Sequence, residues 1–283
     1  MSASQKEVLT YRGYKPAAPI SSARFSGRLL SGVTVLVFIF LYAPILGLIA
    51  FSFNASKSQA VWKGFTWNWY AVALKNETIL ACVKHSLIVA AATTLIATIL
   101  GTLAGLGLAR KFRGSAATAG LIYLPILIPE IVLGVSMVSF FGVAHWQLSA
   151  WTIIVSHVVF SLSYVAIVVR ARLAGFDRTL EEAARDLGAA PLGVFWRVKF
   201  PLILPGVLAG ALLAFTVSVD DYVITSFVYP PGWQTLPLYI YSEVKRGVTP
   251  EVNAISTLLL GVTVAMILIA QRLTRSNLSK GRV

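Results

Sequence analysis

The sequence has a single cysteine, Cys82, so a disulfide bond within the chain is excluded. Its three histidines, His85, His145 and His157, are scattered and show no metal-ligand spacing. The sequence also lacks a Walker loop, a Gly-x-Gly-x-x-Gly turn after a strand and a Ser-His-Asp set. We therefore expect no metal, no bound cofactor and no catalytic site in this chain.

Charged residues are also scarce, at 12% of the chain, and few of them are acidic. Hydrophobic residues make up 57%, and the mean hydropathy of +0.77 is typical of an integral membrane protein. The net charge is +13, with 24 basic residues against 11 acidic ones. The basic residues lie mostly in short loops between apolar runs rather than around aromatic motifs, so nucleic acid is not an expected partner.

Long apolar runs predict about six transmembrane helices and an all-α membrane protein. Each run can cross a hydrocarbon core of roughly 30 Å as a helix, and lipid excludes open sheets. Within the second run, Gly101-x-x-x-Gly105 predicts a face for close helix packing. The runs cover residues 29–53, 86–109, 116–141, 151–169, 202–228 and 253–271.

The expected organisation is a transmembrane domain over residues 29–275, with tails at 1–28 and 276–283. The first tail is polar and basic, and residues 21–28 are expected to form a short helix along the membrane surface. Most lysines and arginines lie in the tails, in the connection after the second run and in the 175–201 loop. The positive-inside rule therefore places that loop and both termini in the cytoplasm. Trp62, Trp67, Trp69 and Tyr70, in the first external loop, predict an aromatic belt at the membrane interface.

The 175–201 loop carries the signals of a compact helix-turn-helix. Thr179 is a candidate N-cap, and Glu182, three residues later, would complete a capping box. Gly188 is placed to end the helix in a left-handed conformation, Pro191 can open a second helix, and Pro201 marks the next apolar run. Such a hairpin either simply joins two spans or docks on a soluble partner, and the pattern alone favours the first interpretation.

The same loop resembles the "EAA" motif of ABC-importer permeases. The resemblance rests on Glu182-Ala183-Ala184, Gly188 and Val198-x-Phe200-Pro201, where the family usually ends in Ile-x-Leu-Pro. It implies the type I (MetI-like) permease fold in a bacterial inner membrane. It also implies that this loop forms a coupling helix for a partner ATPase dimer, which binds the ATP and Mg²⁺. The residues assigned to coupling are Thr179, Glu182, Ala183, Ala184, Gly188 and Pro201.

Glu130 is an acidic residue within the third apolar run, where lipid would penalise an unpaired carboxylate. Pro125 and Pro129 are expected to interrupt this run, so that Pro129 opens a half-helix with Glu130 at its second position. Two interpretations stay open. Glu130 is either a local cap on the half-helix dipole, or a pathway charge at a broken helix.

Asp220 and Asp221 lie in the outer half of the fifth run. In a regular helix they point about 100° apart, so we expect one to line a pathway while the other meets a partner or the external surface. The alternative is that both are solvated near the interface. Tyr222 follows them, and Tyr229 and Trp233 flank a helix-ending Pro-Pro-Gly. Carboxylates beside aromatic rings suit an organic cation and repel an anion.

This region resembles the spermidine/putrescine permeases, in particular the second permease of such systems. The resemblance rests on residues 213–228, Thr235-Leu-Pro and residues 247–253, together with Tyr42-Ala-Pro in the first run. It implies a polyamine importer with a second homologous permease and a periplasmic substrate-binding protein. It assigns the substrate pathway to Glu130, Asp220, Asp221 and Tyr222. The alternatives are an importer for another organic cation or zwitterion, and a secondary carrier or channel. A membrane enzyme using the three acids is disfavoured, because no base, metal or nucleophile accompanies them.

Overall fold

The computed structural model describes residues 22–57, 61–110, 112–177 and 179–279, with side chains placed within 29–268 of these ranges. The described part is helical and contains no strand, only one isolated bridge between Asn54 and Phe65. The all-α prediction is confirmed. Residues 1–21 and 280–283, which hold most of the two predicted tails, lie outside these ranges. The helices are α1 (Ser22–Ser52), α2 (Asn68–Ala73), α3 (Glu77–Leu108), α4 (Ser115–Leu127), α5 (Glu130–Val143), α6 (Ala150–Ala174), α7 (Thr179–Asp186), α8 (Pro191–Val194), the π-helix η1 (Phe195–Lys199), α9 (Phe200–Asp220), α10 (Val223–Val228), α11 (Leu236–Arg246) and α12 (Pro250–Ser279).

The chain divides into two compact units, and the boundary between them in the sequence falls between Leu48 and Ile49. The first unit consists mainly of α1, and its described apolar side chains are largely exposed. Residues 22–28 are helical and continuous with α1, rather than a separate helix as the sequence predicted. An exposed apolar helix of this length needs lipid or another protein around it, as expected of a membrane span.

The centre of the second unit is the contact between α3, α6 and α9, which glycines allow to approach closely. A Cβ atom at Gly101 would lie 2.6 Å from Val165 Cβ, and one at Gly105 would lie 3.1 Å from the Ala166 carbonyl oxygen. The predicted packing face of α3 is therefore confirmed. Gly210 likewise allows α9 to approach α6 closely, since a Cβ there would lie 3.2 Å from Val165 Cα. The sequence analysis did not single out this second glycine contact.

We expect Gly101→Leu to destabilise the bundle, because a side chain there would overlap Val165 and the Leu162 carbonyl. Overpacking of this kind costs about 1–3 kcal/mol or more. The measurement is the thermal unfolding temperature of the purified protein in detergent. Gly107→Leu is the matched control, because Gly107 lies on the same helix with open space around its Cβ position. Equal unfolding temperatures for the two variants would show that the close contact is not needed.

The third apolar run forms two helices, α4 and α5, which meet at an angle of 106°. The residue before a proline is driven out of the helical region, and Ile128 before Pro129 has an extended ψ of 136°. The predicted interruption is confirmed at Pro129, whereas Pro125 lies inside α4. Among the described residues, five helices are long and apolar enough to cross a membrane, or six if this bent pair counts as one span.

The fifth run also departs from the prediction, because α9 ends at Asp220 instead of continuing to residue 228. Asp221 has an extended ψ of 124°, and its Oδ2 accepts the amide N–H of Thr225 at 2.8 Å. This carboxylate therefore caps the short helix α10. The side chain of Asp221 thus accounts for the end of one helix and the start of the next.

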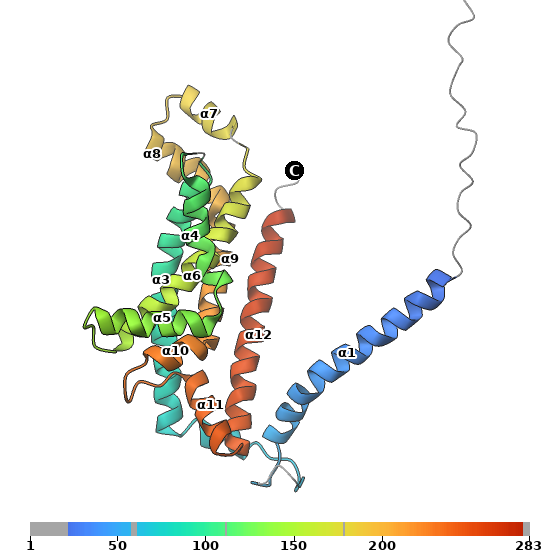
Figure 1. Cartoon of the computed structure of the whole chain (residues 1–283). Coiled ribbons are helices and arrows are strands. Elements are labelled where there is room, and N and C mark those ends of the chain that lie inside the picture. The colour runs from blue at the N-terminus through green and yellow to red at the C-terminus, as the bar shows by residue number, and fades with distance from the viewer. Residues whose placement is uncertain (1–21, 58–60, 111, 178, 280–283) are drawn as a thin grey trace, which may run out of the picture. The chain divides into compact units, whose positions relative to one another are not determined.

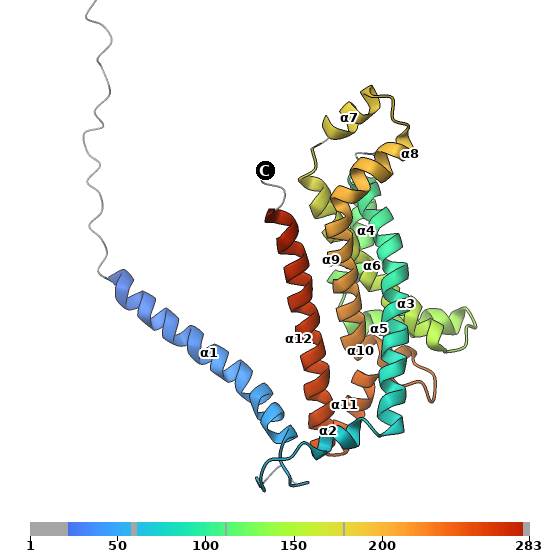
Figure 2. The ribbon, with the colours of Figure 1, turned by 180° about the vertical axis from the view of Figure 1, so that it is seen from behind.

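Figures 1 and 2 show that the second unit has two distinct ends. Helices α7 and α8 lie at one end, together with the last turns of α12. Helices α2 and α11 lie at the opposite end, next to the first turns of α12. The α7–α8 hairpin and helix α11 thus lie at opposite ends of the bundle.

Aromatic residues at the end of α1 and in the loop that follows it form one cluster. Phe53 stacks on Phe65 with ring centroids 5.1 Å apart, and Trp67 meets Phe53 edge-on at 4.7 Å. The indole N–H of Trp69 donates to the Asn54 carbonyl oxygen at 2.8 Å. These contacts fix the loop that follows α1. The predicted membrane belt stays a prediction.

Candidate functional site

The first candidate site is the α7–α8 hairpin, and its turn is built on Gly188. Gly188 has a φ of +82° and donates its N–H to the Arg185 carbonyl oxygen at 2.8 Å. The next amide, of Ala189, donates to the Ala184 carbonyl oxygen at 3.0 Å. These two bonds form a Schellman motif, which favours glycine at its left-handed position. Pro191 then opens α8 at its first turn, so both turn predictions are confirmed.

The start of α7 differs from the predicted capping box. Thr179 is the first residue of the helix rather than the residue before it. Its amide N–H donates to Asp177 Oδ1 at 2.9 Å, and this bond holds the pKa of Asp177 below its ordinary value. The prediction that Thr179 is the N-cap is therefore wrong, because the Asp177 carboxylate reaches this amide instead.

Glu181 joins α7 to the base of α9. Its Oε1 lies 2.9 Å from Lys199 Nζ, in the π-helical segment that leads into α9. Its Oε2 also lies 3.6 Å from Arg185 one turn away. The pairing with Lys199 joins residues far apart in the sequence, so no local pattern indicated it. The pair therefore links α7 to the segment that precedes α9.

The outward surface of the hairpin is apolar with charged neighbours. Glu182 and Ala183 are exposed, while Ala184 is half-buried. Leu187 is 90% exposed and Leu192 is 70% exposed. Pro201 is exposed in the first turn of α9. Uncovered leucines on a hairpin at the end of the bundle are a surface that fits an apolar cleft on another protein.

The second candidate site is a cavity of about 410 Å³ at the opposite end, between the end of α9 and helices α11 and α12. Asp220 and Tyr222 line it, whereas Glu130 and Asp221 do not. Its walls are Asp220, Tyr222, Pro237, Ile240, Tyr241, Val244, Ser256, Leu259, Leu260 and Thr263.

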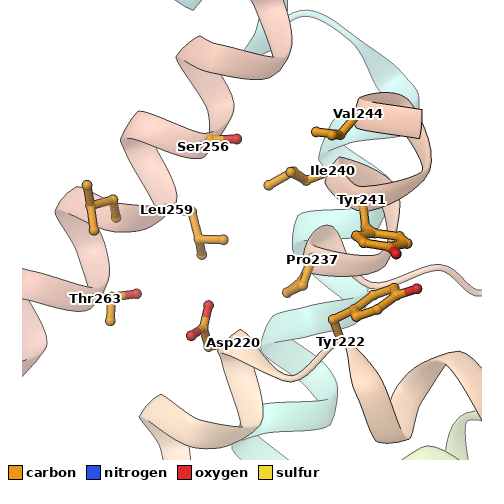
Figure 3. A pocket seen from close by; sticks show the side chains of 10 residues that line it. Asp220, Tyr222, Pro237, Ile240, Tyr241, Val244, Ser256, Leu259 and Thr263 are labelled. Carbon is orange, nitrogen blue, oxygen red and sulfur yellow. The ribbon is translucent and has the colours of Figure 1, made fainter. Parts of the chain in front are cut away.

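The cavity combines a carboxylate, aromatic rings and an apolar wall. Figure 3 shows Asp220 directed toward Leu259 of α12, with Tyr222 and Tyr241 close to each other on another side. The two tyrosine rings lie 4.0 Å apart between centroids. Lys245 Nζ lies 4.6 Å from the Tyr241 ring centroid, so the protein's own ammonium group already uses this ring. The cavity is chemically suited to a molecule with an ammonium group and an aliphatic part.

Asp221 points into the protein, away from this cavity, and it pairs with a histidine that the sequence analysis treated as isolated. Its side chain is 5% exposed, and its Oδ2 lies 3.1 Å from Nε2 of the fully buried His157. The two neighbouring carboxylates thus have different surroundings. The expectation that the second carboxylate meets a partner or the external surface is wrong for Asp221, because its side chain faces His157 inside the chain. The description of His157 as isolated is wrong, because its partners come from α9 and α10, which are distant in sequence.

Glu130 lies in the first turn of α5, where free backbone N–H groups stabilise a carboxylate. Pro129 precedes the helix instead of opening it, so Glu130 is the first helical residue rather than the second. Its side chain is exposed in this chain. This position fits a half-helix cap, and the pathway role of Glu130 stays a prediction.

The fold is similar to that of a bacterial ABC transporter involved in the import of the acidic polysaccharide alginate. The TM-score is 0.71 at 16% sequence identity, covering 91% of this chain and 97% of the other. This likeness confirms the predicted type I importer permease fold.

The sequence is much more similar to two permease proteins of polyamine transport systems. The chain is 41% identical over 242 residues to the spermidine/putrescine transport system permease protein PotC of Haemophilus influenzae, covering 85% of this chain and 94% of PotC. It is 45% identical over 237 residues to the putrescine transport system permease protein PotI of Escherichia coli, covering 81% and 84%. The family described as "binding-protein-dependent transport system inner membrane component" matches residues 97–277. The chain therefore belongs to the family of binding-protein-dependent inner-membrane transport permeases.

Proposed function

We propose that this chain is a permease subunit of an ATP-driven importer that carries a polyamine of the putrescine or spermidine type by alternating access. The observation that carries the proposal is the cavity that places the Asp220 carboxylate with the adjacent, tilted rings of Tyr222 and Tyr241. The similarity to PotC and PotI, along most of the chain, supports the same substrate class.

The chemistry of the cavity fits a polyamine better than an anion or a neutral solute. A polyamine carries ammonium groups separated by methylene chains. Asp220 supplies an opposite charge, and the tyrosine rings supply cation–π attraction, worth about 0.5–1 kcal/mol at an exposed site. Ile240, Leu259 and Leu260 supply an apolar wall for the methylenes. Ser256 and Thr263 add hydroxyl acceptors.

The proposed assembly contains a second homologous permease, an ATPase dimer and a periplasmic substrate-binding protein in the inner membrane. The ATPase dimer would bind ATP and Mg²⁺ and would dock on the α7–α8 hairpin, whose exposed Leu187 and Leu192 fit an apolar cleft. Both termini and the hairpin would be cytoplasmic, and the cavity would face the periplasm. Closure of the ATPases would displace α7, and the Glu181–Lys199 pair would pass that motion to α9.

Proteoliposomes holding the co-expressed complex test this function. With the binding protein outside and ATP inside, we expect uptake of radiolabelled putrescine or spermidine that stops without ATP. Excess unlabelled polyamine should compete, whereas a zwitterionic amino acid should not. Uptake that continues without ATP would reject the importer in favour of a carrier or channel.

The second candidate is an importer of the same construction for another organic cation or a zwitterion. A single cavity carboxylate, Asp220, with a neighbouring Lys245 ammonium also suits a solute that carries both charges. The same competition assay separates the two, because a zwitterion would then suppress the uptake of label better than a polyamine.

A further inference from the structure

We propose that His157 is a positioning residue for the cavity, which holds Asp221 inward and thereby leaves Asp220 and Tyr222 facing the ligand. This inference builds on the proposed function, because it concerns the same cavity. It assigns different roles to two adjacent carboxylates: Asp220 contacts the substrate, and Asp221 anchors the backbone that carries it.

The His157 ring connects three helices at the point where α9 ends. It belongs to α6 and is fully buried. Its Nδ1 lies 2.8 Å from Ser218 Oγ on α9, and its Nε2 lies 3.1 Å from Asp221 Oδ2. The same Nε2 lies 2.9 Å from Thr225 Oγ1 on α10. Both ring nitrogens therefore have partners, one on each side of the break.

The Asp221 carboxylate is satisfied entirely from the protein side. Its Oδ2 accepts the amide N–H of Thr225 at 2.8 Å and the hydroxyl of the same residue at 2.7 Å, besides its contact with His157. A buried carboxylate needs such donors, because an unpaired one is strongly disfavoured. These contacts hold the Asp221 side chain in place and keep its charge out of the cavity.

A second contact from α6 holds the far end of α10. Thr152 Oγ1 lies 2.8 Å from the Val228 carbonyl oxygen, and Thr152 is fully buried. From α5, Gly134 lies against the Phe227 ring, which a Cβ at that position would overlap. Helix α10 is thus fixed at both ends, and the turn at Asp220–Tyr222 is fixed with it.

The turn decides where the cavity residues point. The apolar pattern of residues 202–228 favours one continuous helix, in which each residue is rotated by about 100° from the last. The extended backbone at Asp221 breaks that rotation and lets Asp220 and Tyr222 line the same cavity. Without the His157 contact, the Asp221 carboxylate would lose a hydrogen-bond partner on α6, and the continuous helix would compete.

Thiol labelling tests the positioning without any transport assay. Cys82 is buried and is replaced with alanine, and Asp220→Cys supplies the reporter in the complex. A trimethylammonium methanethiosulfonate reagent should label Cys at position 220 quickly when His157 is present. Adding His157→Phe should slow labelling about tenfold, because a lost hydrogen bond to a charged group changes populations by that order.

A matched transport measurement uses the chain with Asp220 intact. His157→Phe should raise the KM for polyamine uptake about tenfold, with a smaller change in kcat. His157→Gln should bring the KM most of the way back to the parental value, because the glutamine amide can donate to Asp221. Combining His157→Phe with Asp221→Asn should add no further change to that of Asp221→Asn alone, since both remove one interaction. His145→Asn, at an exposed turn with a φ of 52°, is the control and should leave the KM unchanged.

Each outcome decides a separate point. Unchanged labelling in the His157→Phe background would overturn the positioning role, even if polyamine is transported. Slowed labelling in a complex that takes up no polyamine would support the positioning role and reject the proposed function. If His157→Phe does not reach the membrane, Ser218→Ala and Thr225→Val each remove one hydroxyl of the network. Labelling at the parental rate in both would overturn the proposal.

Discussion

Gly188→Asp should reduce ATP-driven uptake by at least about a hundredfold, equivalent to about 2.7 kcal/mol of lost coupling, while the chain still inserts into the membrane. Gly188 ends α7 at a φ of +82°, and its Cβ position is open. The added carboxylate would meet no steric obstacle in this chain. It would place a negative charge at the negative end of the helix dipole, on the surface proposed to enter the ATPase.

The control for this variant is Gly188→Asn. Asparagine has nearly the same shape and also tolerates the left-handed region, so it separates charge from backbone strain. We expect Gly188→Asn to retain most uptake. The measurements are uptake, membrane insertion and co-purification of the ATPase. Full ATP-coupled uptake by Gly188→Asp would reject the coupling assignment.

Glu182→Lys tests the same surface from the middle of α7, and we expect an equal loss of uptake. Glu182 is exposed, so its charge is available to a partner, whereas the neighbouring Glu181 is committed to Lys199. Glu182→Gln removes the charge without reversing it and should lose less than Glu182→Lys. If both variants transport normally, the exposed carboxylate has no role in docking.

The second large effect is expected at the cavity, where Asp220→Asn should raise the KM for polyamine uptake about thirtyfold. The estimate takes the loss of one charge-assisted bond to an ammonium as about 2 kcal/mol. Asp220 is exposed to the cavity and lines it together with Tyr222, so its charge is available to a ligand. Michaelis–Menten analysis of uptake in proteoliposomes measures the change.

Asp220→Glu is the matched control, because it keeps the charge and lengthens the side chain by one methylene. It should retain uptake within a few-fold of the parent. The combined Asp220→Asn and Asp221→Asn chain should lose transport further, since the second change removes the anchor of the turn. Parental uptake by this pair would reject a pathway role for either carboxylate.

Local sequence signals predicted the parts of the fold that depend on neighbouring residues. Gly188 and Pro191 fixed the hairpin turn, and Pro129 fixed the break in the third run, because each acts on its own backbone or on the residue before it. The Gly101-x-x-x-Gly105 spacing predicted a packing face because two small residues one turn apart leave room on the same side of the helix. These features needed no knowledge of which helix would become the neighbour.

The features that were missed depend on contacts between distant residues. His157 and Asp221 are 64 positions apart, and Glu181 reaches Lys199 only after the hairpin has folded. The end of α9 was missed because the apolar residues on both sides of Asp220 and Asp221 predict a single run over residues 202–228. The helix ends there because the Asp221 carboxylate accepts the amide N–H of Thr225 and so starts a new helix. A pattern of apolar residues does not indicate where one helix ends and a second begins within the same run.

The glycine contacts of α3, α6 and α9 have a mechanical consequence. With Gly101, Gly105 and Gly210 at the contacts, these backbones meet without side chains as spacers, so the three helices resist sliding past one another. The helical segment Pro191–Asp220 runs for 30 residues, about 45 Å, between the hairpin and the cavity. If this segment moves as one rigid body, a small lateral displacement of its hairpin end tilts the whole helix. Asp220, the last residue of the segment, would then be displaced at the cavity.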